Sequence, residues 1–173
     1  MRIIEKLNKL PIRAGDYLVL PNLETPYFVI PLISRDIFNS SLSLVKHKSL
    51  IGWFKKIGLQ FVPLFLLRRF FSVITIQSDN DNDSSYQLIL PWNQDVYNKF
   101  TIFNFNKDNI TLVKAGFGKY RKMINNEYHS ILTMQKFGKN IAPEVVGFYE
   151  YKYFTKIETV FYDGIHPNYL PVS

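Results

Sequence analysis

The pattern of apolar residues between positions 86 and 162 is the strongest constraint on how this chain can fold. Five short runs have the alternating or β-branched composition of strands: YQLILP, YNKFTIFNF, ITLVKAG, VVGFYEYKYF and KIETVFY. One long helical pattern, residues 119–137, lies between the third run and the fourth. This order predicts an α+β fold in which a five-stranded antiparallel sheet packs against a single helix.

A polar segment divides the chain before this region begins. Residues 77–85 (QSDNDNDSS) have no apolar side chain and are rich in residues that form turns and helix caps. We therefore expect a linker at 77–85. It would join an N-terminal module, residues 1–76, to a second part, residues 86–173.

The N-terminal module mixes helical and strand-like patterns. Residues 2–9 have an amphipathic helical spacing, whereas DYLVLP and PYFVIPL are β-rich runs bounded by prolines. Helical spacing returns from Ser34, Pro63 should end or kink the second long helix, and SVITI at 72–76 has the composition of a strand. We expect these elements to form a module that packs on the sheet.

Composition excludes several classes of site. The chain has no cysteine, which excludes a disulfide scaffold, a thiol nucleophile and cysteine-ligated zinc. Its three histidines are far apart in the sequence, so a histidine-rich metal site is not expected. Residues 1–10 carry four charges and no run of about 18 apolar residues occurs. We expect a cytoplasmic protein, with peripheral attachment to the inner face of the membrane as the second option.

Two charged residues of the second part are candidates for an ion pair between the third strand and the helix. The third strand-like run carries Lys114 in LVKAG, and the helix carries Glu127 in NNEYHSIL, 13 residues later. A lysine side chain is flexible, and a carboxylate partner would hold its ammonium in one place. If the helix packs on the sheet, both side chains should point into one cleft. His129 falls on another face of the helix, so we expect no role for it there.

These residues resemble the small lobe of kinase-like phosphotransferases, most closely that of the aminoglycoside-phosphotransferase and choline-kinase group. The resemblance depends on the order of elements and on LVKAG, NNEYHSIL and IAPEVVGFY. It implies that Lys114 contacts the α- and β-phosphates of ATP bound with Mg²⁺, and that Glu127 orients Lys114. It also implies that the backbone near Val160 and Tyr162 forms the hinge contact for a purine.

The first part adds to the resemblance. FVIPLISRDIFNSSLSLVKHKSLIGWFKKIG is similar to the segment that precedes this lobe in some bacterial phosphotransferase-like proteins, which are often associated with surface-polysaccharide gene sets. Together the two regions cover about three quarters of the chain.

The sequence departs from this family where catalysis would occur. The 173 residues contain no HxDxxxxN or DFG pattern, and WNQDVYNK, between the first two strands, has no glycine. A kinase-like enzyme takes its catalytic and metal-binding aspartates from a large lobe. We therefore expect a truncated phosphotransferase-like protein that at most binds nucleotide and transfers no phosphoryl group alone. Such a chain would be a truncated gene product, a degenerate relative of the family, or half of a site whose missing lobe is supplied by another chain.

The net charge of +7 allows a second function. Residues 46–69 combine six basic side chains with a Trp/Phe stripe, the composition of a helix that lies on a membrane surface. The alternatives are a core helix with a solvated basic side and a non-catalytic module that binds a protein partner. Nucleic acid is the least favoured partner, because the basic residues are spread over both parts and no nucleic-acid motif occurs.

Overall fold

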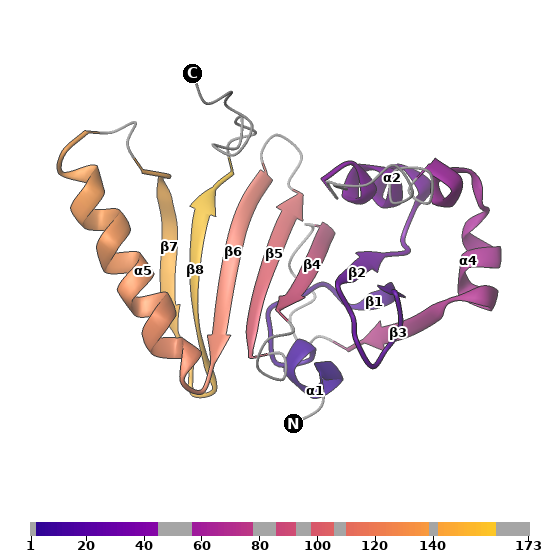
Figure 1. Cartoon of the computed structure of the whole chain (residues 1–173), viewed down its shortest axis with the longest axis horizontal. Helices are drawn as coiled ribbons and strands as arrows, with labels where there is room; N and C mark the ends of the chain where they lie inside the picture. Colours follow the sequence, from indigo (N-terminus) through magenta and orange to yellow (C-terminus); the bar gives the residue numbers. More distant parts are fainter. Residues whose placement is uncertain are drawn as a thin grey trace, which may run out of the picture.

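In the computed structural model of the chain we describe residues 3–44, 57–77, 86–92, 98–105, 110–138 and 142–161. The helices are α1 (Ile3–Leu7), α2 (Arg35–Leu44), α4 (Leu64–Phe70) and α5 (Tyr120–Gln135), and residues 57–61 are also helical. The strands are β1 (Gly15–Leu20), β2 (Phe28–Pro31), β3 (Ser72–Ile76), β4 (Tyr86–Trp92), β5 (Lys99–Phe105), β6 (Ile110–Phe117), β7 (Val145–Glu150) and β8 (Phe154–Val160). These elements confirm an α+β protein (Figure 1).

The prediction of a five-stranded sheet is wrong, because the described residues form an antiparallel sheet of eight strands. Its order is β3-β1-β2-β4-β5-β6-β8-β7, so strands from both sides of the polar segment belong to it. The junction is made by β2 and β4, where Val29 pairs with Ile89. A strand edge leaves backbone hydrogen-bonding groups open, and β2 covers the edge that β4 would otherwise expose.

The predicted order of elements in the second part is confirmed. Three strands are followed by α5 and then by two more strands, and all neighbours in the sheet are antiparallel. At their junction the last two strands differ from the sequence pattern: β7 is shorter than the run VVGFYEYKYF, whereas β8 begins before the run KIETVFY. β7 ends at Glu150 and residues 151–153 form the connection to β8.

One face of the sheet is covered by the N-terminal segment, and we call it the N-terminal face. Leu7, Leu10 and Ile12 are buried there against side chains from seven strands. Those strand residues are Tyr17, Val19, Val29, Ile74, Ile76, Ile89, Phe100, Ile102, Val113, Ala115, Phe117 and Phe154. A single apolar core therefore joins the first part of the chain to the second.

Polar contacts fix the N-terminal segment to the sheet. Gln87 of β4 accepts a hydrogen bond from the Arg13 amide at 3.0 Å and donates one to the Pro11 carbonyl at 3.2 Å. The Lys6 ammonium donates to Asn98 Oδ1 at 2.7 Å. Lys6 is buried, and desolvation lowers its pKa from the usual value.

The opposite face, which we call the helix face, carries α2 and α4 near one end of the sheet and α5 near the other (Figure 1). At the first end Leu18, Ile30, Leu32, Phe38, Leu42, Leu67 and Leu88 are buried together. At the second end Ile124 and Ile131 of α5 pack on Ile157 of β8. The side chains of β6 alternate between the two faces, so Val113 and Ala115 enter the N-terminal core and Lys114 lies on the helix face.

Candidate functional site

The connection between β6 and α5 places the helix directly over the sheet. Gly116 lies beneath the first turn of α5, where a Cβ atom would be only 2.6 Å from the Tyr120 carbonyl oxygen and 2.9 Å from the Ile124 side chain. Gly118 then turns the chain with φ of +55°, a conformation that glycine adopts without steric cost. Two glycines therefore allow the strand to lead almost at once into a helix that runs back across it.

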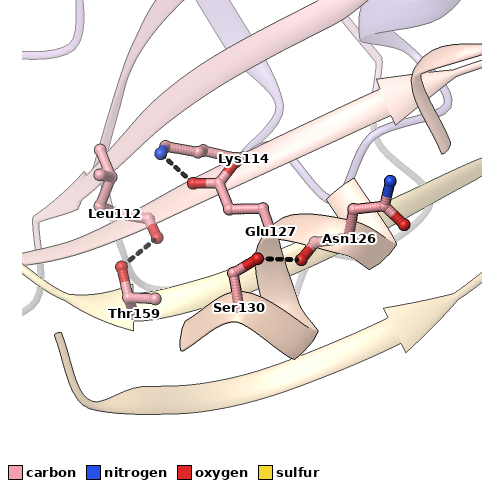
Figure 2. A network of polar contacts seen from close by, with 6 residues as sticks. All are labelled: Leu112, Lys114, Asn126, Glu127, Ser130 and Thr159. Carbon is pink, nitrogen blue, oxygen red and sulfur yellow. Dashed lines mark hydrogen bonds and ion pairs between the residues drawn. The ribbon is translucent and has the colours of Figure 1, made fainter. Parts of the chain in front are cut away.

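This arrangement brings Lys114 and Glu127 together. The Lys114 ammonium donates to Glu127 Oε1, so the ion pair expected from the sequence is present (Figure 2). Glu127 lies three residues after Ile124 and four before Ile131, the two buried residues of α5. It is therefore on the border of the packed side of the helix, from which its side chain reaches the strand.

The ion pair between Lys114 and Glu127 is only partly buried, which limits its contribution to stability. The Lys114 and Glu127 side chains are 31% and 28% exposed. Partly exposed ion pairs contribute about 1 kcal/mol or less to stability. The contact therefore adds little to the stability of the fold. Its main physical effect is to hold the ammonium in one place, and the exposed fraction leaves both groups accessible to a ligand.

Residues next to the pair form a mixed polar and aromatic surface. Lys114 is paired in register with Thr101 of β5 and Ile157 of β8. Two positions along β8 from Ile157, the Thr159 hydroxyl donates to the Leu112 carbonyl at 3.4 Å (Figure 2). Farther along the strands the rings of Phe103 and Phe161 meet edge to face, with centroids 5.2 Å apart.

Arg121 fixes the first turn of α5 to the β7–β8 connection. Its guanidinium donates to the Tyr151 carbonyl at 3.0 Å, the Lys152 carbonyl at 3.3 Å and Thr155 Oγ1 at 3.2 Å. Nothing in the helical spacing distinguished Arg121 from the other basic residues of KYRK. Because it is engaged with these acceptors, it acts as a clamp on the helix that carries Glu127.

The structure places Val160 at the end of β8, as expected, but its backbone donor is occupied. The Val160 amide donates to the Glu144 carbonyl at 2.9 Å, and the Phe161 amide donates to the Ile110 carbonyl at 3.0 Å. Tyr162, the other residue expected at this contact, lies outside the described residues. The two amide donors that the structure describes here are therefore engaged within the chain.

A metal site is not formed among the described residues. No three His, Cys, Asp or Glu side chains in that part of the chain lie together as ligands. His129 is exposed, and its ring packs beside that of Tyr128 at 5.3 Å. Glu127, the carboxylate of the candidate site, is already paired with Lys114.

A second polar cluster, which sequence reasoning did not identify, lies on the N-terminal face beyond the N-terminal segment. Thr111 Oγ1 donates to Glu158 Oε1 at 2.7 Å, and the Lys156 ammonium lies 4.5 Å from the centroid of the Tyr149 ring. Burial, then Tyr149 and Glu158, raise the pKa of Tyr151. The period-two spacing of β8 could have placed Lys156 and Glu158 on one face. These groups satisfy one another, so the cluster is structural.

Comparison with protein-family models, curated proteins and solved structures finds no match to this chain. Its function must therefore be argued from the geometry of its own residues.

Proposed function

We propose that the chain binds a nucleotide, ATP with Mg²⁺, on the helix face, and that Lys114 is the phosphate contact. The observation that carries the proposal is the ion pair between Lys114 of β6 and Glu127 of α5. In kinase-like proteins a lysine on the third strand contacts the nucleotide phosphates, and a glutamate on the next helix pairs with it. Here the lysine lies on β6, the third strand after the polar segment, and the glutamate lies on α5, the helix that follows it.

The surroundings of Lys114 support a ligand that has both a charged and an apolar part. The ammonium would face phosphate oxygens, and the edge of the Phe103–Phe161 pair would lie toward the base. Because the amides of Val160 and Phe161 are engaged, hydrogen bonds to a purine would come from carbonyl groups of this segment or from Tyr162. Such recognition would be weaker than a contact that uses a free amide donor and acceptor together.

Mg²⁺ would be bound mainly through the phosphates of the nucleotide. Magnesium sites commonly combine one or two carboxylates with substrate phosphates, and the described residues offer no cluster of carboxylates. The metal would therefore lower the negative charge of the triphosphate, while Lys114 contacts the oxygens that remain. The proposal assigns the metal no ligand from the described part of the chain.

Binding without phosphoryl transfer is the activity we propose for this chain alone. Neither the HxDxxxxN nor the DFG pattern occurs in the 173 residues, and those aspartates activate the acceptor and bind the metal in kinases. A second chain that provides them would be the partner for catalysis. The association with surface-polysaccharide genes remains part of this proposal, since it depends on the sequence resemblance.

A thermal-shift titration with ATP and Mg²⁺ tests the proposal. Ligand that binds only the folded state stabilises it by RT ln(1 + [L]/Kd), so ATP at about 100 times its Kd adds about 2.7 kcal/mol. Tm should rise with ATP, and Lys114→Ala should abolish the rise. Lys122→Ala is the control, because it removes an exposed lysine from the first part of α5, the helix that carries Glu127. An unchanged Tm at millimolar ATP would remove nucleotide binding from this chain.

A further inference from the structure

The surface of the chain between residues 57 and 71 is unusually rich in exposed phenylalanine. Phe61, Phe65 and Phe70 are 79%, 68% and 72% exposed, and Phe71 is also exposed. Single exposed apolar side chains are common on proteins, but groups of large ones often mark a contact surface. These four residues and Arg69 will be called the Phe–Arg surface.

The break at Pro63 determines how these rings are presented. The sequence pattern placed residues 46–69 in a basic amphipathic helix, but in the described part helical residues 57–61 are separated from α4, which starts after Pro63. Within α4 only Leu67 is fully buried, against the core beneath α2. Phe65 and Arg69 are one helical turn apart on the outward side, and Phe70 follows Arg69. Residues 45–56 lie outside the described residues.

The charge of the protein is concentrated in the same part of the sequence. From residue 37 to residue 78 the chain has six Lys or Arg and no Asp or Glu, which gives +6. The other residues have 15 Lys or Arg against 14 Asp or Glu, which gives +1 of the total of +7. The Arg68 guanidinium is engaged, since it lies 3.5 Å from Asp16 Oδ2 and donates to the Leu32 carbonyl at 3.1 Å. Arg69 is exposed and available to an external anion.

We propose that the Phe–Arg surface binds the interface of an anionic lipid bilayer. Exposed phenylalanines can enter the boundary between headgroups and acyl chains, while arginines and lysines remain at the level of the phosphates. No described helix is long and apolar enough to cross a membrane, and the proposed contact is one at the bilayer surface. The sequence segment that carries this surface, residues 37–78, has a net charge of +6, which favours an anionic bilayer over a neutral one.

The position of α4 makes this surface independent of the nucleotide proposal. α4 lies at the opposite end of the molecule from α5, which carries Glu127 (Figure 1). A chain that supplied a missing catalytic lobe would have to lie against the Lys114 side of the helix face. The Phe–Arg surface would remain open to a bilayer in such a complex. Its test therefore does not depend on whether ATP binds.

Vesicle co-sedimentation of the full chain tests the proposal. The protein should sediment with phosphatidylcholine vesicles that contain phosphatidylglycerol, should remain in solution with phosphatidylcholine alone, and should be released as salt increases. Arg69→Glu should lower the partition coefficient by at least about fivefold, since one basic residue near an anionic surface contributes about that factor. Phe65→Ser should lower it by about tenfold through lost apolar burial.

Matched variants elsewhere on the surface separate this site from general attraction of a basic protein. Lys122→Glu changes the net charge as Arg69→Glu does, and Phe137→Ser removes an exposed ring at the end of α5. Both should bind vesicles as the wild type does. Equal losses from Lys122→Glu and Arg69→Glu, or unchanged binding by Phe65→Ser, would overturn the proposal. Concentration-dependent dimerisation that Phe65→Ser abolishes, without vesicle binding, would assign the surface to a second copy instead.

Discussion

Tyr17 of β1 is fully buried, and its hydroxyl donates a 2.8 Å hydrogen bond to the Arg13 carbonyl. Burial raises the pKa of the Tyr17 phenol well above its usual value. Above about pH 10 the unfolded chain therefore loses this proton while the folded chain keeps it. Stability from Tyr17 is present below that pH and falls above it, by up to about 1.4 kcal/mol per pH unit.

The effect of Tyr17→Phe on the free energy of unfolding should change sign between neutral and alkaline pH. At pH 7 the variant should be less stable by about 1 kcal/mol, because the hydrogen bond is lost. Above about pH 10 it should lose stability less steeply than the wild type, and the two curves should meet near pH 11. Urea unfolding at a series of pH values measures this, with Tyr27→Phe as an exposed control. Parallel curves at all pH values would contradict the burial of the phenol.

At the residue scale the sequence predicted the ion pair between Lys114 and Glu127, but it did not predict that Lys6 is buried. Lys114 and Glu127 could be paired in advance because both the residue types and the order of a strand and its following helix were visible. Lys6 could not be placed in this way. An amphipathic pattern assigns a lysine to solvent, but the N-terminal segment packs on the sheet and Lys6 meets Asn98, 92 positions away. Contacts of such separation have no local pattern.

At the element scale the position of α5 depends on Gly116. Gly116→Ala would place a methyl group 2.6 Å from the Tyr120 carbonyl oxygen, so the first turn of α5 must move away from β6. We expect a loss of about 1–3 kcal/mol, as for other overpacked sites. Displacement of α5 would also separate Glu127 from Lys114, so the Tm increase with ATP should decline. Thermal unfolding with and without ATP measures both effects.

Gly118→Ala provides the control for this displacement. Gly118 has φ of +55° and open space around its Cα, so alanine there brings backbone strain without a clash. The strain should cost roughly 1–2 kcal/mol, while the Tm increase with ATP stays as in the wild type. If Gly116→Ala kept the full ATP response, the site would not depend on how α5 is placed.

The elements themselves were largely predictable, because their patterns are local. Period-two runs predicted β4, β5 and β6, and Pro63 was expected to interrupt a helix, as it does before α4. The side of a helix that packs was harder to predict. Met123 and Met134 belong to the apolar pattern of α5, yet both are about half exposed, and only Ile124 and Ile131 are buried. Helical spacing alone does not define where the sheet ends beneath the helix.

At the scale of the whole molecule the sequence was least informative. The polar segment at 77–85 indicated two parts, whereas the sheet continues across it through the pairing of β2 with β4. Which strands become neighbours depends on apolar surfaces that only the assembled chain brings together. The core on the N-terminal face illustrates this, since Leu7, Leu10 and Ile12 pack with residues as distant as Phe154. No window of the sequence contains both sides of that contact.

This shared core predicts that the chain unfolds as one unit. Leu7 is fully buried in the core that includes Phe100 and Val113 of the second part, so Leu7→Ala should cost about 2–5 kcal/mol. The loss should appear in a single transition that is the same by far-ultraviolet circular dichroism and by tyrosine fluorescence. Leu23→Ala, at an exposed position, should leave the transition unchanged. A folded fragment of residues 86–173, or a second transition insensitive to Leu7→Ala, would instead show that the sheet is made of two independently stable parts.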